Sequence, residues 1–233
     1  NTVLDMTIDQ GVITLLVEEG EIDSSFPLPE SSSYIKSFNI NGTEYNYENN
    51  TNEYHFKNTS VQLTPIAIAS ANQNLVIIFE TDGLYTGVHR GNIDFVVSIF
   101  SRNNSESYKH VITKQFGTEG DDLVSGVKLV DTNIYVYGQT DGLEFDGAAG
   151  LEANKGSTDG FIYKLSVAKG DNSWSRFIGT SDADEVISIA AGISEIAVLT
   201  KRETSDIGAF VRKINGAGKD VEDVEDTNDL VQL

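Results

Sequence analysis

The stretch DDLVSGVKLVDTNIYVYGQTDG, residues 121–142, decides the fold because the chain repeats its pattern. It reads as an apolar strand, a tight turn, a second apolar strand and an Asp-Gly corner, and STDGFIYKL at residues 157–165 reads as a third strand. The related stretch ADEVISIAAGISEIAVLTKRET occupies residues 183–204. Self-similarity at a regular period is typical of repeat architectures. The sequence therefore predicts one structural unit that recurs along the chain.

Four copies of this unit are present. Their second strands begin at Val12, Leu75, Ile134 and Ile196, which are 63, 59 and 62 residues apart. An aromatic residue marks the third strand of each copy, and a fourth strand is expected after it, at residues 229–233 in the last copy. Repeats of about sixty residues with four short strands predict an all-β fold, a β-propeller whose blades are four-stranded antiparallel sheets.

We expect a single propeller domain over residues 1–233, with blades at about 1–60, 61–122, 123–184 and 185–233. Three arrangements of these blades are open. The four blades form a complete ring, or part of a larger ring, or half of an eight-bladed ring made by two chains. A non-propeller all-β fold is a further alternative.

Composition limits the partners. The chain carries 36 Asp and Glu against 16 Lys and Arg, which gives a formal net charge of −20. Binding to nucleic acid or to an anionic membrane surface needs clustered cations, so this charge argues against both. The longest apolar runs are about five or six residues, whereas a membrane-spanning helix needs about 20. Because there is no cysteine, the fold needs no disulfide.

The third copy resembles the bacterial SBBP-type β-propeller repeat. The shared features are Phe-Gly-Thr at residues 116–118, an acid pair at 121–122, a Gly-x-Thr-x-Gly corner at 138–142 and Asp-x-Phe at 159–161. The resemblance is best over about residues 91–215. It implies a secreted or cell-surface protein, usually one without catalysis.

Acidic loops recur between the last strand of one copy and the first strand of the next. They place Asp121 and Asp122 after one Gly-Thr pair, and Asp182 and Asp184 after another. Carboxylate and carbonyl oxygens are the ligands that Ca²⁺ prefers. Calcium bound at these loops is one hypothesis, and water-exposed carboxylates that cap their own turns are the alternative. No other cofactor is predicted.

Three tyrosines lie between the third and fourth strands of the first copy, at Tyr45, Tyr47 and Tyr54. Because aromatic rings combine a large apolar face with a polar group, we predict that these tyrosines form a binding surface for a protein or a glycan. Trp174 stands at the aromatic position of the repeat and is predicted to pack between blades.

No catalytic residue is identified, since the chain has no Gly-x-Ser-x-Gly, phosphate loop or zinc-ligand spacing. The leading expectation is a non-catalytic extracellular or cell-surface propeller that mediates adhesion, assembly or protein and glycan binding. One alternative is a carbohydrate-active enzyme or lectin that uses the central channel. Another is a structural subunit of a surface layer or filament. Oligomerisation is compatible with all three.

Overall fold

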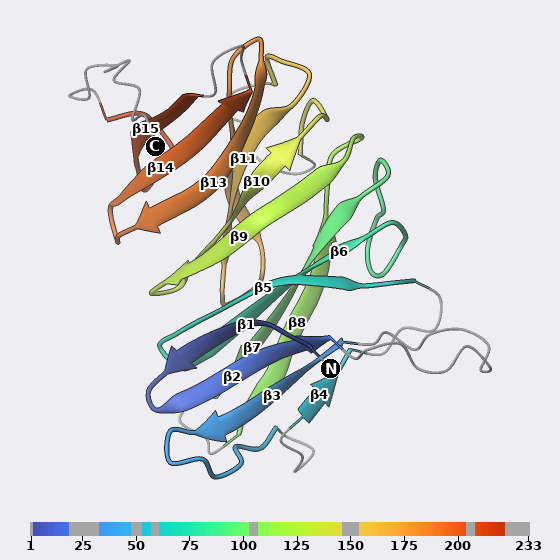
Figure 1. Cartoon of the computed structure of the whole chain (residues 1–233), viewed down its shortest axis with the longest axis vertical. Coiled ribbons are helices and arrows are strands. Elements are labelled where there is room, and N and C mark those ends of the chain that lie inside the picture. The colour runs from blue at the N-terminus through green and yellow to red at the C-terminus, as the bar shows by residue number, and fades with distance from the viewer. Residues whose placement is uncertain are drawn as a thin grey trace.

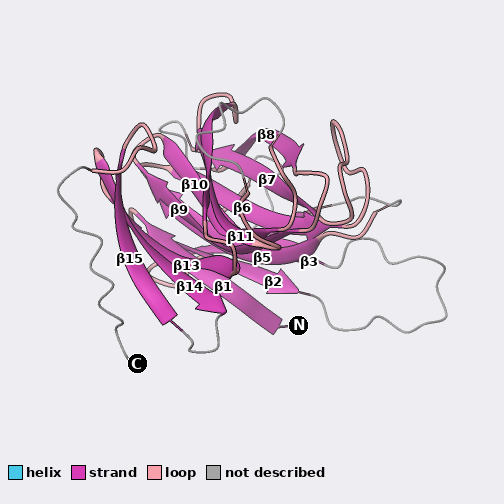
Figure 2. Ribbon diagram, turned by 90° about the horizontal axis from the view of Figure 1, so that it is seen from above, coloured by secondary structure: helices cyan, strands magenta, loops and turns pink. Residues whose placement is uncertain are grey.

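The fold is all-β, as a computed structural model of the chain shows (Figure 2). The structure describes residues 2–18, 33–47, 53–56, 61–102, 107–145, 154–203 and 208–221. Within these ranges fifteen strands form four antiparallel sheets. The described part of the chain contains no helix with the length and hydropathy needed to cross a membrane.

The strands of each sheet follow one another in chain order. The first sheet contains β1 (Thr2–Asp9), β2 (Val12–Glu18), β3 (Ser33–Asn39) and β4 (Glu53–His55). The second contains β5 (Thr64–Ala71), β6 (Asn74–Thr81), β7 (Asp94–Ser101) and β8 (Lys109–Phe116). The third contains β9 (Asp122–Val130), β10 (Asn133–Thr140), β11 (Asp159–Ser166) and β12 (Asn172–Ile178). The fourth contains β13 (Ala183–Ala191), β14 (Glu195–Glu203) and β15 (Gly208–Asn215).

The prediction of an all-β propeller built from four repeats is confirmed. The strand expected at residues 229–233 lies outside the described residues. In the first two sheets, tight hairpins join β1 to β2 and β5 to β6. Their turn residues have positive φ, 47° at Gln10, 79° at Gly11 and 50° at Asn72. Two-residue turns of this kind match the right-handed twist of the flanking strands.

Three hydrophobic clusters hold the sheets together, one between each pair of consecutive sheets. Successive side chains of a strand point to opposite faces of its sheet. Thus β6 directs Ile77 towards the first sheet and Ile78 towards the third. In the same way β10 directs Val136 towards the second sheet and Tyr135 towards the fourth. Trp174 is buried in the last of these clusters, so its predicted role in packing between blades is confirmed.

The sheets stand in an open arc, with the first and fourth sheets at opposite ends (Figure 1). The innermost strands β1, β5, β9 and β13 pack on one another in succession. None of the three hydrophobic clusters of the described residues joins the fourth sheet to the first. Met6 at one end of the arc and Val211 at the other are exposed. The arrangement therefore differs from a closed four-bladed ring, because the outer faces of the end sheets do not cover each other.

Candidate functional site

Two matching turns connect consecutive sheets. Between β8 and β9, the Thr118 N–H donates to Asp122 Oδ2 at 2.6 Å, and the Thr118 hydroxyl donates to Asp122 Oδ1 at 3.0 Å. Between β12 and β13, Thr180 donates to Asp184 Oδ2 from its N–H at 2.6 Å and from its hydroxyl at 2.8 Å. Each carboxylate thus closes its own turn and fixes the start of the next sheet.

A second buried carboxylate lies beside the first turn. Asp94 Oδ2 accepts hydrogen bonds from the Arg90 N–H at 3.0 Å and from Gln115 Nε2 at 2.7 Å. Gly117 lies between the carboxyl groups of Asp94 and Asp122. A Cβ at this position would collide with an oxygen of each carboxyl, so both side chains pack directly on the glycine. Burial raises the pKa of Asp122 to about 7, and the neighbouring Asp94 contributes to the increase. Burial also raises the pKa of Asp94.

The structure places the four aspartates of the predicted calcium loops as follows. Asp122 and Asp184 cap their own turns, as the alternative to calcium expected, but both are buried, whereas that alternative expected caps exposed to water. Asp182 is exposed, and the Asp121 N–H donates to Asp141 Oδ1 at 2.6 Å. Among the described residues, no group of three or more His, Cys, Asp or Glu side chains is arranged to hold a metal ion. Calcium at these loops stays a prediction.

The three tyrosines do not form the accessible surface that we predicted. Tyr45 and Tyr47 are buried in the cluster between the first two sheets. The Tyr47 hydroxyl shares a hydrogen bond of 2.8 Å with Ser37, and Tyr54 packs edge-on against Phe100 with ring centroids 4.8 Å apart. The physical reason is that aromatic rings contribute most to stability when they are buried against other rings.

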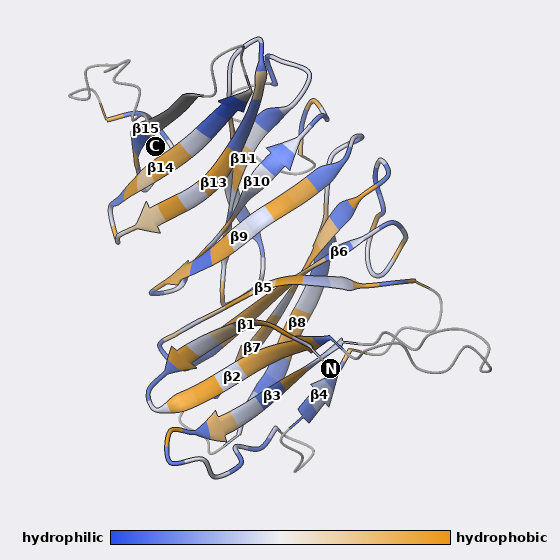
Figure 3. Cartoon of the chain, viewed as in Figure 1, coloured by the Kyte–Doolittle hydropathy of each residue, from blue (hydrophilic) through white to orange (hydrophobic). Residues whose placement is uncertain are grey.

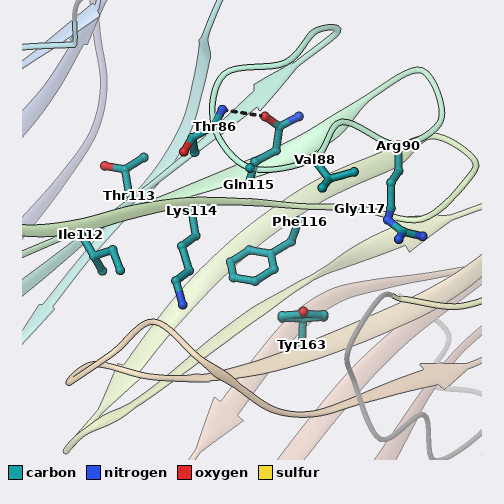
Figure 4. A pocket seen from close by; sticks show the side chains of 11 residues that line it. Thr86, Val88, Arg90, Ile112, Thr113, Lys114, Gln115, Phe116, Gly117 and Tyr163 are labelled. Carbon is teal, nitrogen blue, oxygen red and sulfur yellow. Dashed lines mark hydrogen bonds between the residues drawn. The ribbon is translucent and has the colours of Figure 1, made fainter.

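A pocket of about 470 Å³ opens beside β8, the outermost strand of the second sheet (Figure 4). It lies away from the innermost strands, which line the propeller axis. Three segments form it, namely the loop after β6, the strand β8 and the strand β11. Its lining residues are Thr86, Gly87, Val88, Arg90, Ile112, Thr113, Lys114, Gln115, Phe116, Gly117 and Tyr163.

Gln115 positions the loop that forms the rim of this pocket. Its Oε1 accepts hydrogen bonds from the N–H groups of Tyr85 at 2.8 Å and Thr86 at 3.2 Å (Figure 4). Its Nε2 donates to the Gly83 carbonyl at 3.0 Å and to Asp94. The side chain therefore ties the loop to β8 and to the buried carboxylate behind it.

The wall of the pocket is aromatic and carries positive charge. The rings of Phe116 and Tyr163 have centroids 5.1 Å apart, so the buried Tyr163 of β11 supports the partly exposed Phe116 of β8. Lys114 projects from the same side of β8 as Phe116, and Arg90 projects from the loop after β6 (Figure 4). Lys114 Nζ also donates at 2.6 Å to Asp171 Oδ1, in the connection between β11 and β12. No Asp or Glu is among the described residues that line the pocket.

This pocket was absent from the sequence expectations. Its residues come from two different sheets, and only the packing of β8 beside β11 brings Phe116 to Tyr163. The one available signal was the run Lys114-Gln115-Phe116, where a cation and an aromatic residue alternate on one face of a strand just before Gly117.

The fold is similar to solved β-propellers. No protein-family model matches the chain, and no curated protein matches it. Trypanosoma rangeli sialidase in complex with sialic acid matches with a TM-score of 0.52 and 10% identity, over 94% of this chain and 36% of the sialidase. The same sialidase in complex with 2,3-difluorosialic acid matches with a TM-score of 0.50 at the same identity and coverage. The chain thus spans about a third of the length of these sialidases.

At this identity the similarity shows the β-propeller fold. It also corrects the leading functional expectation, which was a non-catalytic extracellular or cell-surface propeller for adhesion, assembly or protein and glycan binding. Two of the solved propellers to which the chain is similar are sialidase structures, in complex with sialic acid and with 2,3-difluorosialic acid.

Proposed function

We propose that this chain binds carboxylated saccharides in the pocket beside β8. The observation that carries this function is the combination of the partly exposed Phe116, which packs on the buried Tyr163, with two cations, Arg90 and Lys114. This lining occurs in a chain with a formal net charge of −20. A local concentration of positive charge on such a protein attracts an anionic ligand that the rest of the surface repels.

The chemistry of each side chain suits one part of a sugar acid. The partly exposed ring of Phe116 offers an apolar surface for the C–H face of a pyranose. The Arg90 guanidinium can bind a carboxylate with two parallel N–H donors. Lys114 adds a second positive charge, which it shares with Asp171. The function proposed for this pocket is therefore the binding of a sugar acid.

Two further points support a saccharide ligand. The sialidases with this fold were solved with sialic acid and a difluorinated sialic acid, which are carboxylated sugars. The resemblance to the SBBP-type repeat, which we retain as a proposal, implies a secreted or cell-surface protein. Such a location would expose the pocket to glycans.

The test is saturation-transfer NMR and calorimetry with sialic acid and glucuronic acid, and with glucose as the neutral comparison. We expect binding of the two acids only. Arg90→Ala should weaken it about tenfold or more, since a hydrogen bond to a charged group contributes about 1.5–3 kcal/mol. Phe116→Ala should weaken it to a similar extent. Lys109→Ala, an exposed cation of β8 outside the pocket, should leave binding unchanged.

Equal binding of glucose would contradict the proposed recognition of a carboxylate. Equal affinities of Arg90→Ala and Lys109→Ala would place the ligand elsewhere on the molecule.

A further inference from the structure

The two ends of the arc are the two halves of one repeated interface, and we propose that a second copy of this chain covers them head to tail. Inside the chain, each sheet presents one face to the preceding sheet and the other to the following sheet. The first sheet lacks a preceding partner, and the fourth lacks a following one, among the described residues. Both free faces can be compared residue by residue with their covered equivalents.

The free face of the first sheet keeps the apolar pattern of the covered ones. In each sheet, one residue of the first strand pairs with the fourth residue of the second strand. From the first sheet to the fourth, these first-strand residues are Met6, Ile68, Val127 and Ile189. Ile68, Val127 and Ile189 are 6, 6 and 3% exposed against the preceding sheet, whereas Met6 is 61% exposed. Ile8, the next residue on the same face of β1, is also exposed. Figure 3 shows hydrophobic colouring along β2 at this end of the arc.

The free face of the fourth sheet also keeps an apolar residue at a position that is covered in the other sheets, here by the following sheet. Opposite the fifth residue of the second strand, the third strands place Ile35, Val97, Ile162 and Val211. The first three are 0, 1 and 0% exposed against the following sheet, whereas Val211 is 58% exposed. Its strand partner Leu199 is only partly buried. Apolar residues are therefore kept at positions that face a sheet elsewhere in the chain.

A second copy satisfies both faces because one chain carries both of them. The fourth sheet of one copy would receive the first sheet of the other through the same packing that joins consecutive sheets within the chain. A head-to-tail contact of this kind closes into a ring when the rotation between subunits allows it. Two copies that meet at both ends form one closed ring, in which neither apolar face remains in water.

Sedimentation velocity over a range of micromolar concentrations tests this contact. We expect the intact chain to sediment with twice its monomer mass of 25.3 kDa. Met6→Glu and Val211→Glu should each lower the association constant at least tenfold, because each buries a charge in an apolar contact. Both residues are exposed within one chain, so circular dichroism should show unchanged folding. Val111→Glu is the matched control, an exposed valine on β8 away from both faces, and should remain dimeric.

Mixing the two variants distinguishes head-to-tail contact from other contacts. The Met6→Glu chain keeps an intact fourth sheet, and the Val211→Glu chain keeps an intact first sheet, so the mixture should regain association. A monomeric intact chain at every concentration would overturn the second copy as the partner. A dimer that Val211→Glu leaves unchanged would overturn the head-to-tail geometry.

Discussion

At the scale of single residues, Asp122 links the stability of the fold to pH. Its carboxyl closes the turn between the second and third sheets, and burial raises its pKa to about 7. In the unfolded chain an Asp ionises near pH 4. Between about pH 4 and pH 7 the folded chain therefore holds a proton that the unfolded chain has lost. The raised pKa of Asp122 therefore adds to the free energy of unfolding. This stabilisation is complete below about pH 4 and is lost as the pH rises through about 7.

We expect Asp122→Asn to flatten this part of the pH profile. The pKa difference corresponds to roughly 4 kcal/mol at most, by which the free energy of unfolding of the native chain falls across the window. Urea unfolding at a series of pH values measures the slope. Asp131→Asn is the control, because Asp131 lies exposed in a turn with φ 55°, a conformation that Asn tolerates. An identical slope for the native chain and Asp122→Asn would show that Asp122 does not hold the proton.

Other residues show which contacts a linear reading can and cannot predict. The turn-capping role of Asp122 and Asp184 was open as an alternative, since the Gly-Thr and acid spacing is local. The burial of Tyr47 was not predictable, because its ring stacks on Tyr108, which directly precedes β8. Arg90 and Tyr163 were missed for the same reason, since a pocket made by two sheets depends on how those sheets pack.

At the scale of the elements, second strands of different sheets occupy equivalent positions with different surroundings. Ile77 is the fourth residue of β6 and is fully buried between two sheets, whereas Leu15 is the fourth residue of β2 on the free face of the first sheet. Truncating a buried aliphatic side chain removes its transfer free energy and leaves a cavity. Truncation on an open face leaves no cavity.

We therefore expect Ile77→Ala to lower the free energy of unfolding by about 2–5 kcal/mol and Leu15→Ala by about 1 kcal/mol. Both changes are to be measured by denaturant unfolding in the Val211→Glu chain, which the contact proposed above would keep monomeric. Equal losses would mean that Leu15 is covered by some other part of the chain.

The strands themselves were predictable, since apolar residues such as those of β6 and β10 occur in short runs between turn residues. The alternation that sends Ile77 to one cluster and Ile78 to another follows from strand geometry. The opening of the arc was not predictable. It depends on the angle between packed sheets, which no local pattern of residues encodes.

At the scale of the whole molecule, the formal net charge of −20 is the dominant electrostatic feature. Repulsion among like charges destabilises a compact state, and salt screens it over about 10 Å at 0.1 M ionic strength. We expect NaCl to raise the melting temperature from its value at low ionic strength. For a chain of this size, 1 kcal/mol corresponds to about 2–4 °C. A melting temperature that does not change with NaCl would show that the acidic surface costs the fold little.

Calcium chloride at matched ionic strength separates screening from specific binding. If the loops that carry Asp121 and Asp182 bind Ca²⁺, calcium raises the melting temperature above its value in NaCl, because a ligand that binds only the folded state stabilises it. Asp182→Asn should then remove the additional increase, since Asp182 is exposed and its carboxylate is lost without disturbing the buried turn cap Asp184. Asp131→Asn, outside these loops, should keep the increase. Equal melting temperatures in the two salts would contradict calcium binding and leave these loops as turns that Thr118 and Thr180 close with Asp122 and Asp184.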